Sequence, residues 1–226
     1  MEARVVRLTL LNHLFYFTEV SGGSTSATIT GNFIGDLALA YAFRKALAET
    51  DHYFRHLQQP KYEEIRDFGF YCTVARPVSR SEKTEAYVQN TLFNVDGFVD
   101  VKAIEKSGKS PFKNFRQVQG IRLGTDFIAL FLSRDKMQLP GVIRVGRALE
   151  TMVKVQEIVP GEAYHDEFWL NAFSLKTVFD TLDTAIEIAT ERQKINFSFI
   201  LENYNLVKQL TQEEVKLIFN PIFGDG

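Results

Sequence analysis

The order of strand-like and helical patterns along the chain restricts its fold more than any other feature of the sequence. Residues 4–17 (RVVRLTLLNHLFYF) are dense in β-branched and aromatic side chains, which is typical of a β-strand. Residues 30–49 (TGNFIGDLALAYAFRKALAE) then place apolar residues at helical spacing among good helix formers. Further strand-like runs follow up to residue 159. A strand, a helix and then several strands predict an α+β fold with a mainly antiparallel sheet.

The strands expected after the helix are short apolar runs rich in β-branched and aromatic residues. They are residues 69–78, 86–95, 116–123, 126–132, 141–145 and 151–159. In the first run, alternation places Phe70, Cys72 and Val74 on one face, and we expect that strand to end before Pro77. Cys72 is the only cysteine, and its place in this pattern predicts a buried structural thiol rather than a nucleophile.

The helices carry recognisable start signals. Thr30 or Asn32 is expected to cap the first helix, and residues 175–193 also have a helical pattern. Thr211 and Glu214 have the spacing of a capping box, which predicts that a helix begins at QEEVKLIF near the C-terminus.

The length and composition predict a globular protein. At 226 residues, with no repeat and no Pro/Gly/Ser-rich linker, the chain suits one domain spanning residues 1–226. The sequence has no run of about 18 apolar residues, which is the length that a membrane-spanning helix needs. The first residues, MEARVVRLTL, predict no secretory signal, and a single cysteine fits a reducing compartment. We therefore expect a cytoplasmic protein.

The charge is distributed unevenly although the net charge is only −2. Residues 102–154 contain 11 Lys/Arg and 4 Asp/Glu, a balance of +7. Residues 1–101 contain 10 Lys/Arg and 12 Asp/Glu, and residues 155–226 contain 5 Lys/Arg and 12 Asp/Glu. A basic middle between acidic flanks indicates either one polyanion-facing side with other sides facing protein, or charges that scatter over the surface after folding.

Residues 140–150 (PGVIRVGRALE) imitate the glycine spacing of a nucleotide-binding P-loop. A P-loop needs a lysine for the phosphates and a hydroxyl group for Mg²⁺, but this chain has Arg147 and Ala148 there. We therefore interpret the segment as a strand with a bend at Gly146. Such a bend would bring Arg144 and Arg147 to one side and let the Gly146 N–H approach a phosphate.

Other candidate chemistry is weaker. His52 and His56 have the i, i+4 spacing of metal ligands, but Tyr53 replaces the glutamate of the zinc-protease motif and no third ligand is evident. We expect neither a metal nor another cofactor. His13 is a candidate general acid or base near the end of the first strand, although a structural role is the more common one for such a residue.

Four ordered segments resemble a known family. They are LTLLNHLFYFTEV followed by FIGDLALAYAF, then ARPV, and then LPGVIRVGRALETMVKV. Together they are similar to the handle-binding subunit of the type I-D CRISPR Cascade effector complex, the first Csc protein in the Cas five group of the RAMP superfamily. The loop EVSGGSTSATITGNF is poorer in charged and aromatic residues than that family, and the C-terminal third gives no match.

The resemblance implies a ferredoxin-like (RRM/RAMP) core with a long thumb hairpin, for which residues 77–120 are the candidate. It implies a subunit that holds the 5′ handle of the CRISPR RNA and caps a backbone subunit of the Cas seven type. It also implies that this subunit lies beside a large subunit of the Cas ten d type and near the protospacer-adjacent motif (PAM) of the target DNA. The expected function is therefore non-catalytic RNA binding.

The expected RNA contacts combine cations for phosphates with aromatic rings for bases. They are Arg144 and Arg147 first, then Lys113, Arg116 and Arg122, with Lys154 and Arg76 as further cations and Phe112 and Phe115 as stacking residues. Two alternatives remain open at this stage. One is a metal-independent endoribonuclease for CRISPR repeat RNA, with a general base such as His13 or a cluster of Tyr, Lys and His residues. The other is a structural adaptor that binds only protein.

Overall fold

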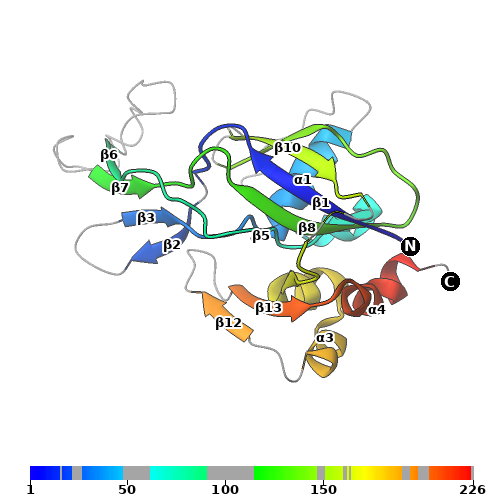
Figure 1. The fold of residues 1–226 in the computed structure, drawn as a ribbon. Coiled ribbons are helices and arrows are strands. Elements are labelled where there is room, and N and C mark those ends of the chain that lie inside the picture. Colours follow the sequence, from blue (N-terminus) through cyan, green and yellow to red (C-terminus); the bar gives the residue numbers. More distant parts are fainter. Residues whose placement is uncertain are drawn as a thin grey trace.

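The computed structural model of the chain confirms the α+β class. It describes residues 1–15, 17–21, 27–47, 62–90, 115–146, 151–159, 162, 164–189, 194–197 and 204–224. Strands in these ranges form three sheets, and helices pack against the largest of them. Figure 1 shows this main sheet with a second sheet to one side and the C-terminal elements below.

The main sheet is antiparallel throughout its described pairings. Its strand order is β4-β8-β1-β10-β9, and β5 also pairs with β8. Its strands are β1 (Glu2–Leu10), β4 (Phe70–Cys72), β5 (Arg76–Pro77), β8 (Asp126–Ser133), β9 (Val142–Val145) and β10 (Thr151–Glu157). The strands expected at residues 126–132, 141–145 and 151–159 are therefore confirmed.

The side chains of β1 alternate between the two faces of this sheet, as a strand requires. Val6 and Leu8 lie on one face in a core that includes Phe43 of α1 (Asp36–Leu47). Val5 lies on the opposite face in a second core that includes Leu130 of β8. Both faces therefore bury apolar side chains at the centre of the sheet, against different elements.

The C-terminal third covers the second face over β8 and β4. A backbone hydrogen bond connects this C-terminal layer to the segment between β4 and β5, because the Val74 N–H donates to the carbonyl oxygen of Trp169 at 3.1 Å. The elements of this layer are β11 (Phe168–Asn171), β12 (Lys194–Phe197), β13 (Tyr204–Leu210), η4 (Ser174–Phe179), α3 (Leu182–Ile188) and α4 (Gln212–Phe223). A short 3₁₀ helix, η1 (Tyr62–Phe68), packs against η4.

A second sheet of four strands lies beside the main sheet (Figure 1). Its strands are β2 (Phe17–Ser21), β3 (Ala27–Thr30), β6 (Tyr87–Asn90) and β7 (Phe115–Gln119). β6 and β7 pair antiparallel, as the two arms of a hairpin would. Residues 91–114 lie outside the described residues, so the thumb at 77–120 and the ferredoxin-like core stay predictions.

The capping predictions had different outcomes. At the C-terminal helix the capping box is confirmed, because the Glu214 N–H donates to the Thr211 side chain and the Thr211 N–H to the Glu214 carboxylate. For α1 the prediction of Thr30 or Asn32 as the cap is wrong, since the helix begins at Asp36. Ile34 instead exchanges two backbone hydrogen bonds with Ala75, which hold it in a β-bridge and delay the helix.

Two other local predictions need correction. Residues 175–193 are not one helix, because Asp180 adopts a left-handed conformation (φ 56°) between η4 and α3. Val74 does not share a face with Phe70 and Cys72: it lies in the other hydrophobic core. The strand pairing is interrupted after Cys72, and pairing resumes in β5, which includes Pro77.

Asp36, at the start of α1, is completely buried and its carboxylate joins four elements. The Tyr71 hydroxyl of β4 donates to Oδ2 at 2.9 Å, and the Asn171 amide of β11 donates to Oδ1 at 3.0 Å. The Ser174 hydroxyl of η4 donates to Oδ2 at 2.5 Å. A negative charge at the N-terminus of a helix is also favourable.

We expect Asp36→Ala to lower the free energy of unfolding by roughly 3 kcal/mol or more, because it leaves several buried donors without an acceptor. Urea denaturation followed by circular dichroism measures this loss. Asp183→Ala is the matched control, since Asp183 also lies in the first turn of a helix but is exposed. Equal losses in the two variants would contradict the role of the Asp36 carboxylate.

Candidate nucleic-acid interface

β9 and β10 expose alternate side chains on the face of the main sheet that α1 does not cover. On β9, Ile143 is buried in the core beneath α1, whereas Arg144 points the other way and is exposed. On β10, Lys154 is exposed in the same manner. The surface extends onto β1, and we call it the open face. Its members are Arg7, Thr9, Val142, Arg144, Met152, Lys154 and Gln156.

The strand register places three cations of the open face on adjacent strands. Arg144 is paired with Met152, so Lys154 is its diagonal neighbour. Gln156 is paired with Arg7, so Arg7 is the diagonal neighbour of Lys154 on the other side. Diagonal neighbours on one face of an antiparallel sheet lie about 7–8 Å apart. Arg144, Lys154 and Arg7 thus form a row of cations across the sheet.

This row of cations is not neutralised within the described part of the chain, where none of the three forms an ion pair. On the next strand, β8, the register places the carboxylate of Asp126 opposite Thr9 of the open face. The Thr9 hydroxyl donates to Asp126 Oδ1 at 2.5 Å. The open face is therefore a surface of positive charge that an anionic polymer can neutralise.

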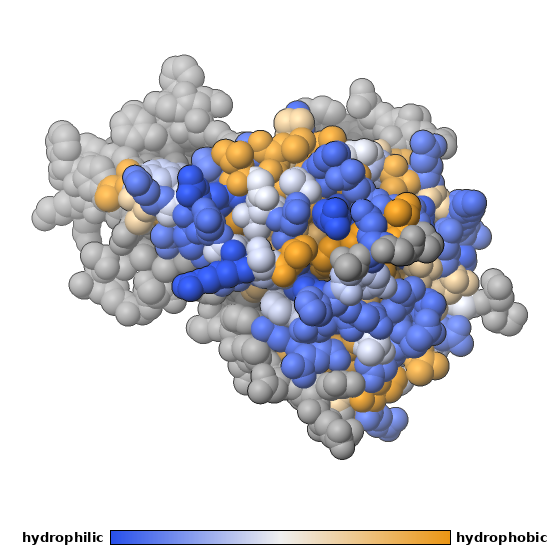
Figure 2. Space-filling view, viewed as in Figure 1, coloured by the Kyte–Doolittle hydropathy of each residue, from blue (hydrophilic) through white to orange (hydrophobic). Residues whose placement is uncertain are grey.

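Exposed apolar side chains adjoin the cations where β1 ends and β10 begins. Leu11 is 46% exposed, Leu123 57% and Met152 37%. The Leu11 N–H donates to the Met152 carbonyl oxygen at 2.9 Å, so the two residues are neighbours. Figure 2 shows hydrophobic surface beside hydrophilic residues over this part of the main sheet. Apolar groups beside cations suit a ligand that carries phosphates and aromatic bases.

The predicted bend at Gly146 is confirmed, with φ at +83°. A Cβ atom there would lie 3.1 Å from the carbonyl oxygen of Phe15 and 3.2 Å from a methyl group of Leu14. The need for glycine at this position is thus explained by its conformation and by a close approach of the chain to itself. Arg147, which was expected to join Arg144 at the bend, lies outside the described residues.

Arg76 is placed inside the fold, in contrast to its expected role at the RNA. It is only 6% exposed, and its guanidinium donates to backbone carbonyl oxygens of Glu167 at 2.5 Å and His165 at 2.7 Å. Burial lowers the pKa of Arg76, and the Glu167 charge opposes this shift. Arg76 joins β5 to the segment before β11, and we omit it from the candidate interface.

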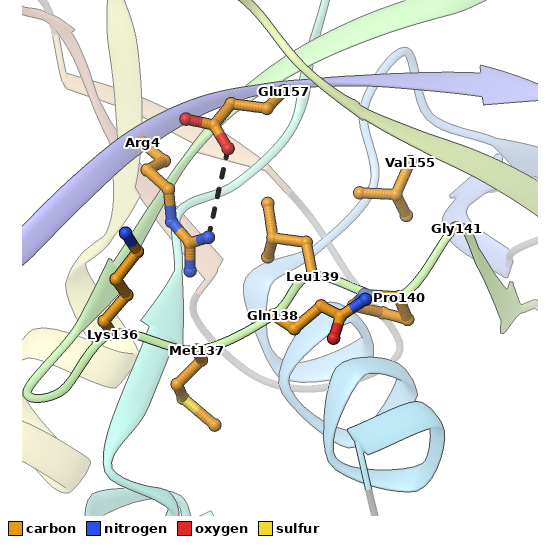
Figure 3. Close-up of a pocket in the computed structure, with 9 residues that line it drawn as sticks. All are labelled: Arg4, Lys136, Met137, Gln138, Leu139, Pro140, Gly141, Val155 and Glu157. Atoms are coloured by element: carbon orange, nitrogen blue, oxygen red, sulfur yellow. Dashed lines mark ion pairs between the residues drawn. The ribbon is translucent and has the colours of Figure 1, made fainter.

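A shallow hollow of about 560 Å³ lies at the opposite side of the main sheet, next to the connection between β8 and β9 (Figure 3). In this view the Arg4 guanidinium lies between the side chains of Lys136 and Leu139. Two carboxylates flank the Arg4 guanidinium, at 3.8 Å for Glu2 and 3.9 Å for Glu157. These carboxylates balance the two cations, so this hollow is less suited to a polyanion than the open face.

The described residues contain no group of three or more His, Cys, Asp or Glu side chains that could hold a metal ion. His52 and His56 lie outside the described residues. No helix in the described ranges is both long and apolar enough to cross a membrane.

A comparison with protein-family profiles identifies the relatives of this chain. Residues 1–220 match the family described as Type I-D CRISPR-associated protein Cas5/Csc1. The chain belongs to this family. It is thus a Cas5-type subunit of a type I-D CRISPR effector complex, as the resemblance of its ordered segments predicted. The match extends through the C-terminal third, for which the sequence segments gave no resemblance. No curated protein sequence matches the chain.

Solved structures with some similarity include subunits of other CRISPR complexes. A chain of the type III-B Cmr-beta complex bound to cognate target RNA and AMPPnP has a TM-score of 0.41 and 9% identity. That match covers 92% of this chain and 84% of the other. A chain of a type IV-B CRISPR complex has a TM-score of 0.36 and 6% identity, covering 72% and 92% respectively. At these TM-scores neither similarity supports an inference about this Cas5/Csc1 member.

The structure brings together two of the expected RNA contacts, Arg144 and Lys154. It adds Arg7, which sequence reasoning missed although it alternates with Thr9 in the first strand. Arg122 lies elsewhere, in an exposed ion pair with Glu82 at 3.0 Å. Phe115 and Arg116 belong to β7 in the second sheet, while Phe112 and Lys113 lie outside the described residues.

The single thiol of this Cas5/Csc1 member is buried, as predicted. Burial raises the pKa of Cys72, and the nearby negative charge of Asp36 raises it further. A neutral, inaccessible thiol is a poor nucleophile. We therefore expect no reaction of the native protein with a colourimetric disulfide reagent at pH 8, and one thiol per chain in 8 M urea. Rapid labelling of the native protein would contradict this placement.

Proposed function

We propose that this Cas5/Csc1 member is a non-catalytic subunit that holds the 5′ handle of the CRISPR RNA on its open face. In the assembled complex it would cap the Cas seven-type backbone, beside the Cas ten d-type large subunit and near the PAM-proximal target DNA. The observation that carries the RNA-binding part of this proposal is the row formed by Arg7, Lys154 and Arg144.

The physical reason is the electrostatics of this row. Three cations on one sheet face repel each other weakly in the free protein, because like charges on neighbouring strands are unfavourable. An RNA strand removes this repulsion and releases its own counterions when its phosphates are bound. The chain as a whole has a net charge of −2, so the positive charge is local and favours binding in one place.

The placement of His13 supports a non-catalytic function. Its Nδ1 accepts a hydrogen bond from the Leu123 backbone N–H at 3.1 Å, so the lone pair of Nδ1 is occupied. Neutral imidazole with an accepting Nδ1 carries its proton on Nε2. His13 in this tautomer offers a donor and has no free lone pair with which to remove a proton. The endoribonuclease alternative would need that lone pair for a general base.

We expect Arg144→Ala with Lys154→Ala to raise the Kd for CRISPR repeat RNA by roughly thirtyfold or more at 0.1 M salt, since each charged hydrogen bond contributes about 1 kcal/mol or more. The slope of log K against log salt should fall by about 1.4, because each contact with a single strand contributes about 0.7. Fluorescence anisotropy between 50 and 300 mM salt measures both values.

The control for this experiment is Lys45→Ala with Lys176→Ala. It also removes two exposed cations, but from α1 and η4 rather than from the open face. If both double variants lose the same affinity and slope, the charge of the whole protein binds RNA and the open face is not the site. If the unmodified chain and its assembled complex bind no RNA, the protein is a structural adaptor.

The catalytic alternative has its own measurement. We expect CRISPR repeat RNA to remain intact when the purified chain is incubated with it in EDTA, because the Leu123 N–H occupies the Nδ1 lone pair that His13 would need as a general base. Denaturing gels of end-labelled RNA show whether defined products form. Cleavage at one position, abolished by His13→Ala, would overturn the non-catalytic assignment.

A further inference from the structure

A small pocket lies beyond the apolar end of the open face, where the chain leaves β1. It has a volume of about 280 Å³ and is lined by His13, Lys83, Thr84, Glu85 and Arg122. This volume is at the lower end of the range for small-molecule sites, and it suits a fragment such as a single nucleobase.

Backbone hydrogen bonds hold the three segments that form the pocket. Leu14 and Ile121 exchange two of them, at 3.0 and 2.9 Å. The Arg122 N–H donates to the Glu82 carbonyl oxygen at 2.9 Å, and the Thr84 N–H donates to that of Gly120 at 3.0 Å. The walls are therefore fixed before any ligand arrives, which reduces the ordering cost of binding.

The polar groups of the pocket differ in their availability. Lys83 donates to the Thr30 carbonyl oxygen, and Arg122 is paired with Glu82. His13 presents Nε2–H, because its Nδ1 is occupied by the Leu123 N–H, and Nε2 has no partner among the described residues. The exposed Glu85 carboxylate likewise has none there. The pocket thus offers the His13 Nε2–H as a donor and the Glu85 carboxylate as an acceptor with two oxygens, beside the Thr84 hydroxyl and the remaining N–H groups of Arg122.

The open face leads to this pocket. The Met152 N–H at the start of β10 donates to the Asn12 side-chain oxygen at 2.7 Å, so the cation row adjoins the segment that carries His13. Exposed Leu11 and Leu123 lie along the way. A strand whose phosphates contact Arg144 and Lys154 can direct an unstacked base past these apolar side chains.

We propose that this pocket receives one unstacked base of the bound RNA and selects guanine. The inference rests on the proposed function, since it requires an RNA strand on the open face. Guanine offers the acceptors O6 and N7 to the His13 Nε2–H. Its adjacent N1–H and amino group offer two donors to the two oxygens of Glu85. The other RNA bases do not combine an acceptor edge with two such neighbouring donors.

The test is a selection of single-stranded RNA from a pool with eight randomised positions, retained by the purified full chain and sequenced. We expect guanine to be enriched at one position of the bound segment. Replacing this guanine by inosine, which lacks the amino group, should lower its enrichment about fivefold or more.

Two substitutions at His13 separate the donor from the fold. His13→Asn keeps an oxygen for the Leu123 N–H but lacks a donor at the Nε2 position, so the guanine preference should disappear. His13→Gln restores an amide donor near that position and should recover part of the preference. Glu85→Gln should weaken it. An abasic RNA of the same length, which offers phosphates but no base, should bind all three variants as tightly as it binds the unmodified chain, because the cation row is unchanged.

The outcomes distinguish this inference from the proposed function. Retention of RNA without guanine enrichment, or with the same enrichment in His13→Asn and Glu85→Gln, overturns the base pocket and leaves the phosphate contacts standing. Failure of the unmodified chain to retain any RNA overturns both. A preference for another base that depends on His13 and Glu85 overturns the assignment of guanine.

Discussion

The buried carboxylate of Asp36 is the interaction on which the arrangement of the layers depends. A buried charge without partners would cost several kcal/mol, so its presence requires that Tyr71, Asn171 and Ser174 reach it together. These donors come from the main sheet and from the C-terminal layer, while Asp36 begins the helix on the other face. The polar cluster thus fixes how three layers meet, which apolar packing alone specifies less strictly.

The open face follows from the position of the C-terminal layer. This layer is held over β8 and β4 by the Asp36 cluster and by the Val74–Trp169 backbone bond, and the residues of it that the structure describes do not extend across β10 and β9. The same face of one sheet is therefore core at one side and exposed at the other. Rigid strands hold Arg144 and Lys154 at a more constant spacing than a loop would. A constant spacing suits contacts with successive phosphates of one nucleic-acid strand.

Much of this fold follows from local sequence patterns. Short apolar runs rich in β-branched and aromatic residues located β8, β9 and β10, and the Thr211–Glu214 spacing located the start of α4, because these signals depend on neighbours in the chain. The start of α1 depends on a partner that is remote in sequence. The β-bridge between Ile34 and Ala75 holds the residues before the helix in an extended conformation, and the local sequence around Ile34 does not predict this pairing.

The candidate site was only partly predictable for the same reason. Arg144 and Lys154 both occupy exposed positions of a strand, and their basic character in an apolar pattern was visible. Whether Arg7 joins them and Arg76 does not depends on the register and on which layer covers each face. Arg76 follows a buried strand and its guanidinium meets carbonyl oxygens about 90 residues away, at His165 and Glu167. A basic residue beside a strand can thus either bind a ligand or join two layers, and only the tertiary arrangement separates the two roles.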